Sequence, residues 1–263
     1  MTIKELVPGL AVIFTTMPSV VSLSRAEDVG QRISVGQQIS AQYANSTVFL
    51  VVRGTKADNK VETNLGTGFV ISNGGYVITA AHLYEDKEHV PYKSSTTVGS
   101  LGSSFDVKAP ASIGGAVQPV DYIDANHQVD IALLKLQTSS MPPSGYVPVH
   151  LCAVTRPAEA QGEQVYSLGF PFGLPLSVNS GTLSSVDIRS RGMWKTDLPV
   201  NDGSSGGPVF DNSRNVIGVI KGGIQAPGNN FIVPVNLAAD LVKEGLASTE
   251  DCDDRVEDIF HRL

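Results

Sequence analysis

Residues 66–79 read GTGFVISNGGYVIT, and this stretch contains two short runs that are typical of β-strands. The runs GTGFVIS and YVIT are rich in the β-branched and aromatic residues that favour strands. Between them, Asn73-Gly74-Gly75 supplies residues that accept the positive φ angles of a hairpin turn. The stretch therefore predicts a β-hairpin, which needs further strands to form a stable sheet.

Short apolar runs bounded by Gly, Pro or Asn recur on both sides of this hairpin. They are Thr47–Arg53, Asp130–Leu136, Gln164–Leu168, Gly181–Ile188, Pro208–Phe210 and Asn215–Lys221. One segment predicts a helix, with Asn236 as the N-cap of Leu237–Glu244 and Gly245 as its stop. Helices do not alternate with the strands, as a parallel α/β sheet would require. We therefore expect an all-β fold in two similar halves, on either side of residues 140–146.

Composition and charge narrow the classes of partner. The chain has 263 residues, and its 41% hydrophobic content is enough for a packed core. Its net charge of −7 repels phosphate backbones, so we expect no nucleic-acid partner. Cys152 and Cys252 are too few for a disulfide framework or a four-cysteine zinc site. The two cysteines could form one bridge or remain two separate thiols. We expect the protein to bind no metal and no cofactor.

The amino-terminal segment predicts export. Leu6–Ser24 carries no charge, and Ser24-Arg25-Ala26 places small residues at the two positions that a signal peptidase reads. We therefore expect a signal peptide over residues 1–26 and a periplasmic or extracellular protein. Pro8 and Pro18 interrupt the apolar stretch, so we expect no stable membrane insertion after cleavage. The alternative is a weakly apolar tail on a cytoplasmic protein.

The motif Gly203-Ser204-Ser205-Gly206-Gly207-Pro208 has the features of a nucleophilic serine. Glycines on both sides of Ser205 permit a tight turn, leave the hydroxyl unobstructed and free backbone amides to point at one spot. A developing oxyanion needs donors that are already aimed at it in this way. An ordinary Gly/Ser turn has the same composition, so the interpretation depends on finding a base.

His82 is the candidate base, because it directly follows the predicted strand that ends at Thr79. We assign the other histidines to solvated, loop, half-buried and tail positions: His89, His127, His150 and His261. Asp130 opens an apolar strand, where a carboxylate can be held in place to orient the base. The chain order His82, Asp130, Ser205 is that of chymotrypsin-type proteases.

The region from about residue 46 to residue 245 resembles a trypsin-like serine protease of the HtrA/Deg type. The resemblance is carried by TAAH at 79–82, VDIALLK at 129–135, GFPFGL at 169–174, SGTLS at 180–184, GSSGGP at 203–208 and VIGV at 216–219. It implies the chymotrypsin fold: two six-stranded antiparallel β-barrels and a short C-terminal helix. It also implies a serine endopeptidase that acts on polypeptides and takes part in protein quality control. Homo-oligomerisation stays open.

The resemblance implies a particular domain organisation. We expect a signal peptide (1–26), an N-terminal extension (27–45), a first barrel (46–140), a second barrel with its closing helix (146–249) and an acidic tail (250–263). About 18 residues remain after Gly245, whereas a domain needs ~50, so we expect no PDZ domain to follow. The family usually has Asn at the position of Ser204.

The resemblance also implies the residues of the site. It implies a catalytic triad of His82, Asp130 and Ser205, with an oxyanion hole formed by the backbone of Gly203, Ser204 and Ser205. It places Pro199 and Val200 at the base of the primary specificity pocket, and Lys221, Gly222 and Gly223 along an edge that a substrate strand joins. Neither pocket residue is acidic, so we expect an aliphatic preference rather than cleavage after Lys or Arg.

Two other functions remain as alternatives. The sequence Gly203–Gly207 satisfies the G-x-S-x-G elbow of lipases and esterases, and Asp240 and His261 follow in the appropriate order. That elbow must lead into a helix, whereas Pro208–Phe210 predicts a strand. The second alternative is a catalytically inactive, protease-like domain that only binds polypeptides. No triad member is missing that would favour it.

Overall fold

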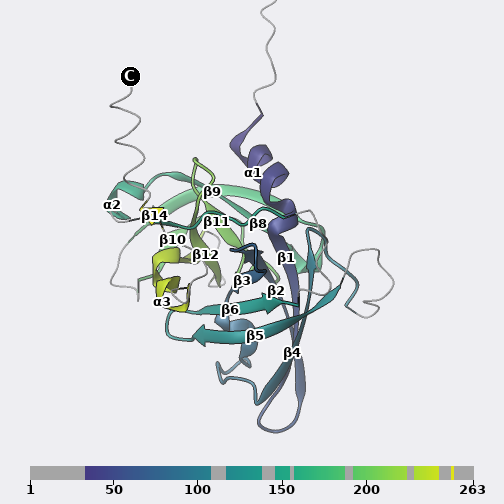
Figure 1. Ribbon diagram of the computed structural model, residues 1–263. Coiled ribbons are helices and arrows are strands. Elements are labelled where there is room, and N and C mark those ends of the chain that lie inside the picture. Colours follow the sequence, from purple (N-terminus) through teal and green to yellow (C-terminus); the bar gives the residue numbers. More distant parts are fainter. Residues whose placement is uncertain are drawn as a thin grey trace, which may run out of the picture. The chain divides into compact units, whose positions relative to one another are not determined.

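The computed structural model describes residues 33–107, 117–137, 146–154, 157–186, 192–223, 228–242 and 250–251. Within them, two closed barrels have the strand orders β1-β2-β3-β6-β5-β4 and β10-β13-β12-β11-β8-β9 (Figure 1). Neighbouring strands in both barrels are antiparallel. The prediction of an all-β fold with two six-stranded antiparallel barrels is confirmed. The predicted signal peptide lies outside the described residues.

The first barrel contains the hairpin from which the sequence analysis started. Its strands are β1 (Thr47–Thr55), β2 (Val61–Val70), β3 (Tyr76–Thr79), β4 (Ser94–Leu101), β5 (Gln118–Asn126) and β6 (Ile131–Leu136). In the hairpin, Phe69 pairs with Ile78 and Val70 pairs with Val77. Pairing of β1 with β4 closes the barrel. Asp130 directly precedes β6. Because β3 and β6 pair in antiparallel orientation, the end of β3 lies beside the start of β6.

The strands of the second barrel are on average shorter than those of the first. Its strands are β8 (Gln164–Gly169), β9 (Ser177–Ser185), β10 (Trp194–Thr196), β11 (Pro208–Phe210), β12 (Val216–Gly223) and β13 (Asn230–Pro234). Each run predicted as a strand overlaps an observed strand. The predicted residues that fall outside the observed strands are Ile71, Ser72, Asp130, Val186 and Asn215, while 187–188 lie outside the described residues. Strands β5, β10 and β13 were not predicted from the sequence, and β10, with three residues, is too short to show a pattern.

The buried apolar side chains form four clusters, of which the smallest contains Phe49 and Phe170. One fills the first barrel around Val48, Leu50 and Leu134, and another fills the second barrel around residues such as Trp194. A third cluster joins side chains of both barrels, among them Phe69, Ile78, Ile131, Leu168, Phe210 and Val233. Burying each such side chain contributes about 1.5–3 kcal/mol, so this shared cluster holds the two barrels against each other. Residues at its rim can therefore come from both barrels.

Helix α1 (Val35–Tyr43) was not predicted from the sequence. Ser34 accepts the backbone N–H of Gln37, and the Gln37 side chain accepts the backbone N–H of Ser34, which makes a capping box. Tyr43 stacks on Phe210 with ring centroids 5.3 Å apart, so α1 covers part of the second barrel. The S-x-x-Q spacing of Ser34 and Gln37 indicates a helix start, but the segment that follows is mostly polar and shows no clear apolar face.

The closing helix differs in its details from the prediction. It begins as a 3-10 helix, η6 (Val235–Ala238), and continues as α3 (Ala239–Val242). The 3-10 turn begins at Val235, directly after Pro234. Asn236 therefore lies inside the turn rather than at an N-cap. The predicted stop at Gly245 lies outside the described residues. No helix in the described ranges is long and apolar enough to cross a membrane.

Cys152 settles the question that the sequence left open about the thiols. It lies on β7 (Cys152–Ala153), which pairs in parallel with β14 (Glu250–Asp251). Cys152 is disulfide-bonded. The only other cysteine in the sequence is Cys252, which lies outside the described residues. A free thiol at Cys152 is therefore excluded. Helix α2 (Pro157–Ala160) follows shortly after β7.

Candidate active site

His82 lies in the first barrel, on the turn that follows β3. The 3-10 helix η2 (Ala81–Tyr84) begins soon after β3, and Ala80 and Ala81 are fully buried. Small side chains at these two positions let the turn pack closely onto the barrel. The His82 side chain, by contrast, is 27% exposed and can be reached by another molecule.

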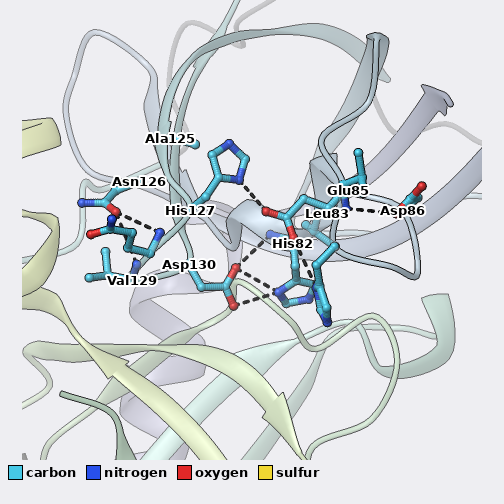
Figure 2. A network of polar contacts seen from close by, with 12 residues as sticks. His82, Leu83, Glu85, Asp86, Ala125, Asn126, His127, Val129 and Asp130 are labelled. Atoms are coloured by element: carbon cyan, nitrogen blue, oxygen red, sulfur yellow. Dashed lines mark hydrogen bonds and ion pairs between the residues drawn. The ribbon is translucent and has the colours of Figure 1, made fainter. Parts of the chain in front are cut away.

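Asp130, which directly precedes β6, contacts both the ring and the backbone of His82. Nδ1 of His82 lies 2.9 Å from Oδ2 and 3.1 Å from Oδ1 of Asp130, and the His82 backbone N–H donates to Oδ1 at 2.8 Å (Figure 2). These contacts occupy Nδ1 and leave Nε2 as the ring nitrogen available for chemistry. Asp130 has φ 63°, a left-handed conformation that Asp tolerates better than most residues and that clusters at functional sites.

The electrostatic surroundings keep Asp130 ionised. Burial alone raises its pKa, since the side chain is only 4% exposed. Hydrogen bonds and positive charge from His82 and Lys221 outweigh burial, so the pKa of Asp130 lies below its ordinary value. Nζ of Lys221 is 2.8 Å from Oδ2. At neutral pH the carboxylate is therefore a fixed acceptor for the His82 ring.

Ser205 lies in a turn that is fastened to the first barrel. Its carbonyl accepts the Thr67 N–H at 2.8 Å, and the Gly206 N–H donates to the Ile220 carbonyl at 2.7 Å. Gly206 has φ 84°, and a Cβ there would lie 2.1 Å from Oγ1 of Thr79 and 2.3 Å from the Thr67 carbonyl. The close approach to β2 and β3 therefore requires glycine at this position.

The Ser205 hydroxyl donates to the Lys221 carbonyl at 3.3 Å. Across the described part of the chain, no hydrogen bond joins His82 to Ser205. Both residues nevertheless line the same two cavities, with volumes of about 740 and 490 Å³. Rotation about one staggered side-chain bond redirects the hydroxyl. Catalytic hydrogen bonds are often long or poorly aligned without substrate, so this arrangement is compatible with a serine–histidine pair.

Two backbone amides of the serine turn find no acceptor among the residues that the structure describes. The Asp202 carbonyl accepts the Phe172 N–H at 2.5 Å, and a trans peptide directs its N–H away from its carbonyl. The Gly203 N–H therefore points away from Phe172. Within the described residues, neither the Gly203 nor the Ser205 N–H donates to a protein acceptor. The Ser204 N–H donates to the Asn201 carbonyl at 2.9 Å, so Ser204 has no free amide to contribute.

Thr67 is a site residue that the sequence analysis missed. Its hydroxyl donates to the Gly203 carbonyl at 2.7 Å and accepts the Phe170 N–H at 3.1 Å. The side chain is fully buried. Thr67 thus fixes the serine turn of the second barrel from a strand of the first. The signal was a hydroxyl residue between two glycines, at the start of an otherwise apolar run.

The larger cavity is the candidate substrate pocket. Val200 lines it together with Met193 and Phe231, whereas Pro199 is exposed and is not among its lining residues. Lys221 and Gly222 also line it. Strand β12 pairs with β13 as far as Gly223, but its pairing with β11 ends at Val219, so the stretch Lys221–Gly223 has one unpaired edge.

The remaining histidines serve other partners. His127 and His89 both contact Glu85. Nδ1 of His127 lies 2.5 Å from Oε1 of Glu85, and Figure 2 shows this contact beside the His82–Asp130 pair. Nδ1 of His89 lies 3.3 Å from Oε2 of Glu85. Glu85 is 8% exposed. His150 lies 3.2 Å from Asn215, and His261 is outside the described ranges. No group of three metal-ligating side chains occurs in the part of the chain that was searched.

The lipase alternative does not fit this geometry. The serine turn leads directly into strand β11, whereas the elbow of lipases and esterases leads into a helix. Asp240 lies on α3, and His261 falls outside the described residues. The Ser205 turn is fastened instead to the barrel that carries His82 and Asp130.

Comparisons with known proteins bear on this arrangement. Residues 66–219 match the family described as "Trypsin-like peptidase domain". The chain is 28% identical over 202 residues to a "Probable periplasmic serine endoprotease DegP-like" of Halomonas elongata, which covers 73% of this chain and 37% of that protein. It is 28% identical over 204 residues to "Serine protease HTRA1B" of Danio rerio, which covers 74% of this chain and 37% of that protein.

A solved structure supports the fold independently. The "Crystal structure of the serine endoprotease from Yersinia pestis" matches with a TM-score of 0.57 and 19% identity, and covers 80% of this chain and 65% of that chain. The chain spans 37% of the length of the curated relatives named above. The family match runs from within β2 to within β12, includes His82, Asp130 and the Ser205 turn, and extends over more than half of the sequence. The chain therefore belongs to the family of trypsin-like peptidase domains.

Proposed function

We propose that this chain is a serine endopeptidase in which His82, Asp130 and Ser205 form the catalytic triad. One observation carries the proposal: Nδ1 of His82 is held by a buried, ionised Asp130, while His82 shares two cavities with the Ser205 hydroxyl. A serine hydroxyl needs a base of fixed orientation to become nucleophilic. Membership of the trypsin-like peptidase family supports this assignment.

The proposed reaction proceeds by acyl transfer. The Ser205 hydroxyl turns from the Lys221 carbonyl to Nε2 of His82, gives up its proton there and attacks the peptide carbonyl carbon. The free amides of Gly203 and Ser205 stabilise the oxyanion; losing one such donor typically costs about 3 kcal/mol. His82 then gives the proton to the leaving amine, which leaves an acyl group on Ser205. A water molecule, activated by His82, releases the acyl group by the reverse sequence.

We propose that the substrate binds as an added strand. The unpaired edge of Lys221–Gly223 offers main-chain groups to an extended polypeptide. The neighbouring cavity has apolar walls from Met193, Val200 and Phe231, which suit an aliphatic side chain. Of the two residues proposed for the base of this pocket, Val200 lines the cavity and Pro199 is exposed beside it in the sequence. A peptide library cut mainly after Arg or Lys would contradict the proposed preference.

We propose that the protein is exported and, from its resemblance to the HtrA/Deg type, that it takes part in protein quality control. The relative from Halomonas elongata is named periplasmic. The disulfide at Cys152 supports export, because such bonds persist mainly in oxidising compartments. The polypeptide substrates of this chain, like its compartment, are inferred by analogy with proteins of which it spans only part.

Labelling with a fluorophosphonate probe tests the proposed function. The probe reacts with an activated serine, so we expect the wild-type protein to be labelled and Ser205→Ala to remain unlabelled. Casein should be cleaved by the wild type, while Ser205→Ala should lose on the order of 10⁶ in turnover. A folded wild-type protein that binds casein but neither cleaves it nor takes the label would favour the inactive binding domain instead.

A further inference from the structure

The Lys221 side chain extends from the second barrel to the catalytic carboxylate of the first. Its Nζ lies 2.8 Å from Oδ2 of Asp130, the oxygen that also lies 2.9 Å from Nδ1 of His82. Asp130 is 4% exposed and Lys221 is 37% exposed, so the ammonium group approaches from the solvent side. The sequence analysis assigned Lys221 only a main-chain role at the substrate edge. Its side chain has a separate partner.

Lys221 contacts two of the three proposed triad residues. Its carbonyl accepts the Ser205 hydroxyl at 3.3 Å, and its ammonium group binds Asp130. Ion pairs between exposed groups contribute little to stability. This pair differs because one partner is nearly buried, where charges interact more strongly than in water. Positive charge at Lys221 is also among the causes that lower the pKa of Asp130.

We propose that Lys221 is a positioning residue that holds the Asp130 carboxylate in place and offsets its negative charge, so that the charge at position 221 influences the pH dependence of the reaction. The inference rests on the proposed function. Because both contacts end on one oxygen, the ammonium lies within about 6 Å of the imidazole, where two like unit charges repel appreciably. A carboxylate already paired with an ammonium also stabilises an imidazolium less.

Other charged groups near His82 also contribute to the electrostatic potential at its ring. Those lining the smaller cavity with it are Glu85, Asp86, Lys87, His89 and Asp202. Glu85 contacts His89 and also His127, whose side chain is 36% exposed, and Asp86 lies 3.7 Å from Lys56. Replacing Lys221 leaves these groups in place. A difference between variants at position 221 therefore reports the Lys221 charge.

Two variants at position 221 and one control separate charge from structure. Lys221→Met removes the charge while keeping much of the length, and Lys221→Arg keeps the charge. Lys60→Met removes an exposed lysine that pairs with Asp58, away from the site. Each protein is assayed for kcat/KM on a peptide substrate from pH 4 to 9. The His82 ring is titrated by NMR over the same range.

We expect Lys221→Met to move the midpoint of the acid limb of kcat/KM to higher pH by about one unit. The NMR titration of His82 should move by the same amount. Lys221→Arg and Lys60→Met should stay within about 0.3 units of the wild type, because the charge near His82 is kept in both. Should Lys221→Met fail to fold, Lys221→Gln removes the same charge.

The inference is overturned if the neutral variants keep the wild-type midpoint, or if they lower kcat/KM at every pH without moving it. The second pattern would mean that Lys221 only supports the structure. The NMR titration does not depend on turnover. An inactive wild type would therefore contradict the proposed endopeptidase, while a shifted His82 titration in Lys221→Met would still support the coupling through Asp130.

Discussion

At the scale of single residues, Asp130 links the stability of the fold to pH. The carboxylate is almost fully buried and accepts the backbone N–H of His82, its ring Nδ1 and Nζ of Lys221. These donors favour the ionised form, so the pKa of Asp130 is lower in the folded protein than in the unfolded chain. A group of this kind stabilises the fold above its unfolded pKa of about 3.9, and that contribution is lost as the pH falls through the folded pKa.

We therefore predict that Asp130→Asn destabilises the protein near pH 7 but not in strong acid. The loss should be on the order of 1–3 kcal/mol, typical of hydrogen bonds to a charged group. Denaturant unfolding of both proteins between pH 2.5 and 7 measures it. Asp124→Asn, at an exposed site on β5, should change the free energy of unfolding by less than about 0.5 kcal/mol. A difference that grew on acidification would contradict the assignment of an ionised Asp130.

The side-chain partners of Asp130 also show what a sequence can predict at this scale. The order of His82, Asp130 and Ser205 along the chain was sufficient to name the candidate triad. The contact between Lys221 and Asp130 was not predictable, because 90 residues separate them and only the packing of two barrels brings them together. The exposure of Pro199 was likewise not evident from the sequence.

At the scale of elements, β2 positions the serine turn through Thr67. The Thr67 hydroxyl satisfies both the Gly203 carbonyl and the Phe170 N–H, and its backbone N–H reaches the Ser205 carbonyl. A buried donor or acceptor that loses its partner typically costs about 1–3 kcal/mol. The strand therefore contributes both to stability and to the orientation of the proposed oxyanion hole.

We predict that Thr67→Val lowers the free energy of unfolding by about 2 kcal/mol or more, since valine keeps the shape but not the hydroxyl. It should also lower kcat by at least about tenfold, because the Gly203 amide loses part of its support. Thr67→Ser keeps the hydroxyl and should retain most of both quantities. An unchanged kcat in folded Thr67→Val would show that the Gly203 amide does not depend on this strand.

Element prediction from the sequence depended on the contrast between apolar runs and turn residues. The hairpin of β2 and β3 was predictable because Asn73-Gly74-Gly75 separates two clear strand patterns. Strand β10 covers only Trp194–Thr196 and depends on pairing with β9 and β13. Helix α1 has a capping box, but Ile39 and Tyr43 bury themselves only against the folded second barrel. Tertiary contacts decide both elements.

At the scale of the whole molecule, the proposed catalytic machinery is divided between the barrels. The first barrel supplies His82 and Asp130, and the second supplies Ser205, the free amides and the unpaired edge of β12. The apolar cluster shared by both barrels holds these parts in register. The two halves were predictable from the distribution of strands. How they face each other followed only from the family resemblance and the structure.

The central claim is that one substrate carbonyl can meet groups from both barrels at once. A crystal structure of the protein with a peptide boronic acid, a mimic of the tetrahedral intermediate, tests it most directly. We predict a covalent bond from boron to Oγ of Ser205, one boronate oxygen accepting the Gly203 and Ser205 amides, and Nε2 of His82 within hydrogen-bond distance of the adduct. An adduct on Ser205 that His82 does not approach, or a boronate bound away from Ser205, would contradict the account.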